Sequence, residues 1–121
     1  MADKKYTRFT VDNRLEAMAE NMYPGGVRID PLPATAGQEV CILYSGLLAN
    51  SGADQVYLHV GYGDAGKWKK VEDVEMDKTG YGWVKVLPAH DLGAMHFCFH
   101  DSAHNWDNNN GVNWTIQVHN G

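Results

Sequence analysis

The sequence has little of several features that would assign it to particular protein classes. Among its 121 residues only two are cysteines, Cys41 and Cys98, too few for a disulfide scaffold. No run of apolar residues approaches the length that spans a bilayer, and the first residues lack the hydrophobic segment of a secretory signal. These shortages predict a cytoplasmic protein that has no membrane partner.

Basic residues are also scarce. Ten lysines and arginines face fifteen acidic residues, which gives a net charge of −5. The basic residues are scattered along the chain, apart from Lys67, Lys69 and Lys70. Nucleic-acid binding requires a basic stripe that neutralises phosphates, so we expect no nucleic-acid partner.

Motifs for common enzymatic reactions are missing as well. The glycines on either side of Tyr62 are not followed by a helix pattern, as a phosphate loop would be, and no serine lies in a nucleophile elbow. Asp73, Glu75 and Asp77 alternate along an expected strand and could supply the acid/base pair of a glycosidase. A solvated strand face explains them better, because nothing apolar nearby would shift a pKa. We expect no enzymatic activity.

Histidine is plentiful, with six in the chain, and a metal site is therefore an alternative. His96, Cys98 and His100 share one face of an expected strand, and His104 follows in a loop. Zinc or copper accepts such donors, but alternate strand positions separate ligands more than a tetrahedral site prefers. We predict no metal and no other cofactor, and a histidine-based metalloprotein is kept as a minor alternative.

From residue 27 onwards the sequence consists of short alternating apolar segments separated by turn residues. The expected strands cover 27–29, 39–44, 55–62, 69–78, 83–87, 94–100 and 113–119. Strands at intervals near ten residues predict an all-β fold, an immunoglobulin-like antiparallel β-sandwich. We assign residues 27–121 to this module and residues 1–26 to an N-terminal extension.

The extension contains a helical pattern. Leu15, Met18, Ala19 and Met22 recur at the spacing of an amphipathic helix, which predicts a short helix over 12–23 that ends at the following Pro-Gly-Gly. The apolar stripe of this helix packs either on the sandwich or on a second copy of the chain, as a homodimer surface.

The spacing of the two cysteines resembles that of the disulfide between the sheets of immunoglobulin domains. Phe97 and Phe99, however, should take the core face of their strand, which turns Cys98 to the other face. We therefore expect Cys41 and Cys98 to be reduced thiols.

The most informative segment is 106–114, where two tryptophans bracket four asparagines, an aspartate and a glycine. Trp114 opens an alternating strand and is expected in the core. Trp106 has no apolar periodicity around it, so a core position and a binding surface are equally open. A rigid polar loop that presents an indole suits a sugar, whose C–H face stacks on the ring while its hydroxyls bond to amides.

A second pair of residues points in the same direction. His59 lies on an expected strand, and Trp68 follows nine residues later across a glycine-rich turn. A histidine alone on a strand is more often structural, and a lone tryptophan more often belongs to the core. If the chain folds back at this turn, the two rings lie side by side, and with Trp106 they offer two flat indoles and an imidazole to an oligosaccharide.

The order of these motifs resembles carbohydrate-binding module families 25 and 53, the starch- and α-glucan-binding β-sandwiches. The resemblance covers about 27–119 and is carried by the following segments: 56–62, Trp68, Met76, 82–88, 97–101 and 106–114. It implies that His59, Trp68 and Trp106 form a sugar platform. It also implies that Asn108 and Asn109 correspond to the asparagine pair of the family, which braces the loop, contacts hydroxyls, or does both.

The resemblance thus implies non-catalytic binding of α-1,4-glucan, such as starch, glycogen or maltooligosaccharides. Because no export signal is visible, intracellular glycogen would be the natural ligand. The alternative from a different class is a sandwich that binds another protein through its helix and its acidic strand, without binding sugar.

Overall fold

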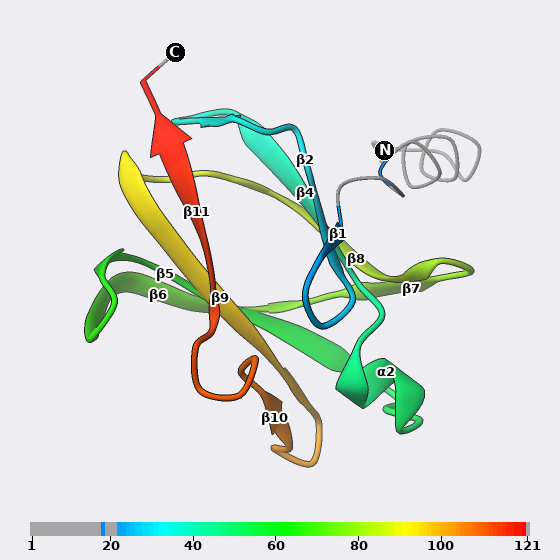
Figure 1. Cartoon of the computed structure of the whole chain (residues 1–121). Helices are drawn as coiled ribbons and strands as arrows, with labels where there is room; N and C mark the ends of the chain where they lie inside the picture. The colour runs from blue at the N-terminus through cyan, green and yellow to red at the C-terminus, as the bar shows by residue number, and fades with distance from the viewer. Residues whose placement is uncertain (1–17, 19–21, 121) are drawn as a thin grey trace.

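Two β-sheets pack face to face in the computed structural model, which describes residue 18 and residues 22–120 (Figure 1). The first sheet has the order β1 (Met22–Tyr23), β2 (Val27–Asp30), β4 (Glu39–Tyr44), β8 (Gly82–Pro88), β7 (Asp77–Thr79). The second sheet has the order β3 (Ala34–Thr35), β11 (Trp114–His119), β9 (Gly93–Asp101), β5 (Val56–Asp64), β6 (Lys67–Glu75), and β10 (Trp106–Asp107) also pairs with β9. The predicted all-β sandwich is confirmed.

Alternation of side chains builds the core, as the sequence predicts. In β9, Met95, Phe97 and Phe99 point inward and are fully buried. Phe97 and Phe99 lie opposite Val60 and Leu58 of β5, which are equally buried. Because successive strand residues face opposite sides, this register leaves the other half of each strand on the outer face of the second sheet.

The structure differs from the sequence prediction at two points. The segment 69–78 is not one strand, because Met76 enters the core and the chain crosses from β6 in the second sheet to β7 in the first. Asp77 therefore does not share a face with Asp73 and Glu75. The pair β3–β11 is parallel, so the sandwich is not wholly antiparallel. β1 pairs with β2 and forms one edge of the first sheet.

A short helix, α2 (Leu47–Asn50), was not predicted. It lies at the same end of the sandwich as β10 (Figure 1). The sequence there reads as a turn, because four residues are too few to show helical periodicity. Within the part of the chain that the structure describes, no helix is long and apolar enough to cross a membrane.

Most of the predicted helix over 12–23 lies outside the described residues. Its last two residues, Met22 and Tyr23, form a strand rather than a helix, because they pair with Arg28 and Val27 of β2. Met18 is buried in a cluster with Cys41, Leu43 and Val84. This residue of the apolar stripe therefore packs on the sandwich, and the dimer surface is not supported.

Cys41 and Cys98 are both buried thiols and are not joined by a disulfide. The reason is the parity expected from Phe97 and Phe99: Cys98 lies opposite His59 of β5, on the outer face of the second sheet. Cys41 belongs to the first sheet.

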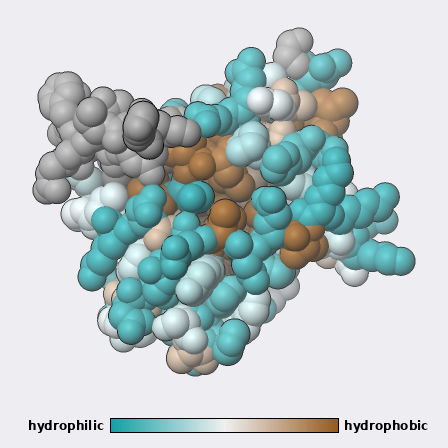
Figure 2. Space-filling view, turned by 180° about the vertical axis from the view of Figure 1, so that it is seen from behind, coloured by the Kyte–Doolittle hydropathy of each residue, from teal (hydrophilic) through white to brown (hydrophobic). Residues whose placement is uncertain are grey.

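Seen from behind, the molecule shows a mainly hydrophilic surface that is interrupted by a few apolar patches (Figure 2).

Candidate functional site

The outer face of the second sheet brings together the three rings that the family resemblance selects. His59 lies between the two indoles, with its ring centroid 5.7 Å from that of Trp68 and 5.2 Å from that of Trp106. The His59 ring is tilted by 33° against Trp68 and stands at 90° to Trp106. Three residues from three strands thus form one continuous aromatic surface, which we call the platform.

Trp68 reaches this face because β6 contains a bulge. The register pairs His59 with Asp73 but Gly63 with Trp68, so β6 has one residue more than β5 between these pairs. Lys70 lies in this stretch and has a φ of 53°, in the left-handed region. An extra residue inverts the alternation of side chains. Trp68 therefore faces the same side as His59 instead of pointing into the core.

Gly61 and His96 fix the position of the Trp68 ring. A Cβ on Gly61 would lie 2.8 Å from the Cβ of Trp68, so only glycine lets the indole pack this closely on β5. His96 stacks against the same indole at 5.4 Å, and its Nε2 donates a 2.6 Å hydrogen bond to the carbonyl of Gly63. The indole N–H of Trp68 donates to the Ala65 carbonyl within its own turn. Trp68 thus presents a ring face and has no N–H left to offer.

Trp106 is the most exposed aromatic ring of the platform, with 46 % of its surface accessible. It lies in β10, opposite His100 of β9, and its ring centroid is 4.4 Å from that of His100. His100 in turn stacks almost parallel on Tyr57, at 5.0 Å and 9°. A half-exposed indole that rests on a buried ring is held in place without being enclosed, so one face can receive a ligand. The core alternative for Trp106 is therefore wrong, whereas Trp114 is buried as predicted.

Asp73 joins two rings of this surface, which the sequence analysis missed. Its Oδ1 accepts hydrogen bonds from Nδ1 of His59 at 2.7 Å and from Nε2 of His100 at 3.1 Å. Burial opposes ionisation of the carboxyl, but the two histidine hydrogen bonds outweigh it and hold the pKa of Asp73 below its usual range. The only signal in the sequence is its place among alternating acidic residues, which does not show which residues lie opposite.

Asn108 and Asn109 brace the loop that follows Trp106. The side-chain oxygen of Asn108 accepts from the backbone N–H of Gly111 at 2.9 Å, and Nδ2 of Asn109 donates to the Asn113 carbonyl at 3.1 Å. Asn109, Asn110 and Asn113 all have positive φ, near 60°. Asparagine tolerates this conformation better than most residues. Backbone geometry thus explains much of the asparagine content of the segment.

The residue after Trp106 is tied to the opposite sheet. The Tyr44 hydroxyl donates a 2.6 Å hydrogen bond to the Asp107 carboxylate and accepts one from the backbone N–H of Leu48. Burial, and then the hydrogen bond to Asp107, raise the pKa of Tyr44, so the phenol remains a donor. This buried strut connects β4, α2 and β10, and it fixes the backbone next to Trp106.

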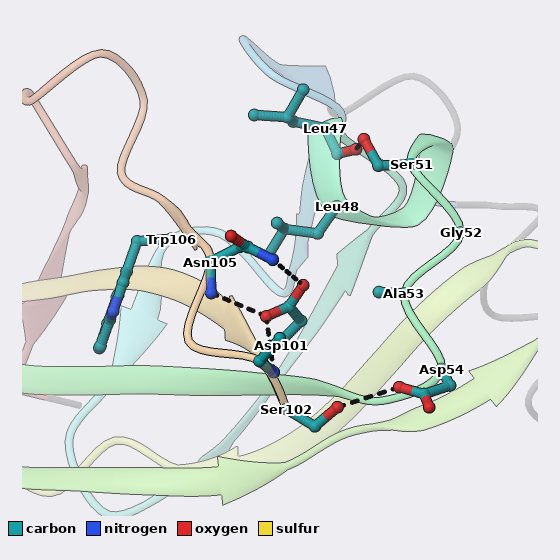
Figure 3. A pocket seen from close by; sticks show the side chains of 11 residues that line it. Leu47, Leu48, Ser51, Gly52, Ala53, Asp54, Asp101, Ser102, Asn105 and Trp106 are labelled. Carbon is teal, nitrogen blue, oxygen red and sulfur yellow. Dashed lines mark hydrogen bonds between the residues drawn. The ribbon is translucent and has the colours of Figure 1, made fainter.

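A hollow of about 660 Å³ opens between α2 and the turn before β10, and Trp106 forms part of its wall (Figure 3). Asp101 and Asp54 also line it. Their carboxylates accept hydrogen bonds from Asn105 and Ser102, respectively. The hollow adjoins the platform, but its polar groups are largely engaged with one another.

His96, Cys98 and His100 share the outer face of β9, as expected from their alternation. Within the described residues, no group of three or more histidine, cysteine or acidic side chains could hold a metal ion. The ring nitrogens of His96 are hydrogen-bonded to the Thr115 hydroxyl and the Gly63 carbonyl, and Nε2 of His100 donates to Asp73.

Comparison with known proteins agrees with the resemblance seen in the sequence. The model of the starch/carbohydrate-binding module family 53 matches residues 40–97, which include His59 and Trp68. An alpha-amylase of Clostridium acetobutylicum is 32 % identical over 107 residues, which cover 84 % of this chain but 13 % of the amylase. The chain thus spans a small part of that relative. No solved structure matches it. The family resemblance is confirmed, and these matches support carbohydrate binding.

Proposed function

We propose that this chain, which matches the family-53 starch/carbohydrate-binding modules, binds α-1,4-glucan on the platform without cleaving it. The observation that carries the proposal is the contact of His59 with both Trp68 and Trp106 on one outer sheet face. Two indoles held at different orientations by a central ring suit a ligand that curves, as α-1,4-linked glucose chains do. Starch, glycogen and maltooligosaccharides are the expected ligands.

The platform combines the two kinds of contact that sugars use. The indole faces of Trp68 and Trp106 take the C–H faces of two glucose rings. His59 supplies a polar ring atom between them, because only its Nδ1 is engaged by Asp73. Each stack adds about 0.5–1.5 kcal/mol to about 1 kcal/mol from burial of the ring face. Two stacks and a hydrogen bond to His59 together suit a dissociation constant on the order of 10⁻⁵ to 10⁻³ M. Such affinity suits a tether to a polymer that has many repeats.

The acid/base chemistry of a glycosidase does not fit this surface. Hydrolysis requires a carboxylic acid with a raised pKa to protonate the leaving oxygen, and a second carboxylate across the bond. Asp73 lies beside His59, but its two histidine hydrogen bonds lower its pKa and keep it ionised. A carboxylate held in this state cannot serve as the general acid. We therefore assign the protein to the binding modules rather than to the hydrolases.

Affinity electrophoresis tests this function. The protein should migrate more slowly in gels that contain amylose or glycogen than in plain gels. Free maltoheptaose should restore its normal migration, and gels that contain cellulose derivatives should not slow it. Trp106→Ala should migrate freely in all gels, whereas Gln117→Ala, an exposed change on β11, should be retarded like the wild type. Unretarded wild-type protein would refute glucan binding. Reducing ends released in proportion to added protein would refute the non-catalytic assignment.

A further inference from the structure

We propose that Asp73 is a positioning residue of the sugar site: it fixes the tautomer of His59 so that Nε2 accepts a hydrogen bond from a glucose hydroxyl. This inference rests on the proposed function. It adds a residue that lies outside the platform and defines the polarity of the contact that His59 makes.

The hydrogen-bond chemistry of the pair sets the tautomer. An ionised carboxylate only accepts, so the 2.7 Å contact between Asp73 Oδ1 and His59 Nδ1 requires the proton on Nδ1. The lowered pKa of Asp73 keeps that carboxylate ionised. In the neutral imidazole the other nitrogen then carries a lone pair. His59 therefore presents an acceptor to the ligand, and the sugar hydroxyl must donate.

Asp73 also holds the ring that supports Trp106. The same Oδ1 accepts from Nε2 of His100, whose side chain is only 8 % exposed. His100 stacks on Tyr57 and contacts the tilted ring of Trp106. One carboxylate oxygen thus orients both imidazoles in contact with Trp106. Removal of the carboxylate would release the His59 ring and leave a buried N–H of His100 without its acceptor.

The position of Asp73 separates this role from that of an ordinary surface acid. Asp73 lies directly opposite His59 across β5 and β6, whereas Glu75, two residues further, lies opposite Tyr57 and is exposed. The Asp73 side chain is still 51 % exposed, so a substitution removes little buried volume. Glu75→Ala is therefore a matched control: it removes the same charge from the same face of the same strand.

The experiment compares the wild type with Asp73→Ala, Asp73→Asn and Glu75→Ala. Long-range ¹⁵N–¹H NMR of histidine side chains reports which ring nitrogen of His59 is protonated, and it does so without ligand. Calorimetric titration with maltoheptaose reports affinity, and circular dichroism reports folding. We expect His59 to be protonated at Nδ1 in the wild type, in Asp73→Asn and in Glu75→Ala, but to exchange between tautomers in Asp73→Ala.

Affinity should follow the tautomer. Asp73→Ala should bind maltoheptaose about five- to twentyfold more weakly than the wild type. Asp73→Asn, whose amide oxygen still accepts from His59, should lose less than about threefold, and Glu75→Ala less than about twofold. The tautomer of wild-type His59 and the affinity of Asp73→Asn can be measured even if Asp73→Ala does not fold. The inference can therefore still be refuted when the alanine variant is unfolded.

Two results would overturn it. One is a wild-type His59 that is protonated at Nε2. The other is a folded Asp73→Ala that binds maltoheptaose as tightly as the wild type. Failure of the proposed function looks different: the wild type itself would bind no α-glucan while the His59 tautomer remained as described. In that case the proposed function and the proposed hydrogen bond from a glucose hydroxyl to His59 Nε2 are both wrong.

Discussion

Trp106→Ala should separate ligand binding from stability. The indole is 46 % exposed, and its buried part rests on His59 and His100 rather than in the core between the sheets. A glucose ring that covers about 50 Å² of its apolar face gains about 1 kcal/mol from burial. The specific stack adds about 0.5–1.5 kcal/mol. The total of about 2 kcal/mol corresponds to about a thirtyfold loss of affinity.

The effect on folding should be small. Exposed side chains away from special backbone positions change stability by little, so we expect Trp106→Ala to cost at most about 1 kcal/mol of unfolding free energy. Trp114→Ala is the matched control at the other end of the same loop. Trp114 is buried, packs on Phe97 and Phe99, and donates its indole N–H to the Pro24 carbonyl at 2.7 Å. Its removal should cost about 3–5 kcal/mol.

Isothermal titration calorimetry with maltoheptaose measures the affinity. Tryptophan fluorescence is unsuitable, because the substitution removes the indole that would report binding. Urea unfolding followed by circular dichroism measures the stability term. If Trp106→Ala keeps the wild-type urea midpoint but loses binding, the result supports the assignment of Trp106 to the platform. Unchanged affinity, or a midpoint that falls as far as that of Trp114→Ala, would refute this assignment of Trp106.

Three further predictions follow from contacts around the platform. Gly61→Ala should weaken maltoheptaose binding several-fold in calorimetry, because the new Cβ would lie 2.8 Å from Trp68 Cβ and displace the indole; an unchanged affinity would show that Trp68 does not contact the ligand in this position. Tyr44→Phe should lower the unfolding free energy by about 1–3 kcal/mol and also weaken binding, because the strut to Asp107 and the acceptor for the Leu48 N–H are lost; a urea midpoint equal to that of the wild type would contradict this. Burial, aided by the charges of Asp73 and Asp107, raises the pKa of Cys98 to about 12, so Cys98 should resist iodoacetamide at pH 8 in the folded protein and react only after denaturation, as mass spectrometry of the alkylated peptides would show.

The strands could be predicted because their information is local. Alternation over 114–119 and the pair Phe97 and Phe99 mark inner and outer faces correctly, and the turn at Ala65 and Gly66 reverses the chain as expected. Short pieces escaped prediction. β10 has two residues and α2 has four, so neither shows a period. Met76 gives no local sign that the chain changes sheet there.

In the candidate site, too, the features that depend on local sequence could be predicted and the others could not. His59 and Trp68 lie in one hairpin, and the structure brings their rings together as the family resemblance suggested. The bulge at Lys70, which turns Trp68 outward, is not visible in the sequence, because its residue type does not favour a positive φ. Asp73 was misjudged for a different reason. A carboxylate on an exposed strand looks solvated until the structure shows two imidazoles within hydrogen-bond distance of it, one on the next strand and one on the strand beyond.

The most direct test of glucan binding on the platform is a ¹⁵N–¹H NMR titration that follows the four tryptophan indole signals as maltoheptaose is added. We predict that the signals of Trp68 and Trp106 shift, and that those of the buried Trp83 and Trp114 stay in place. A β-1,4-linked glucan of similar length should move none of the four. Shifts confined to Trp83 and Trp114, or no shift with either sugar at millimolar concentration, would contradict the platform.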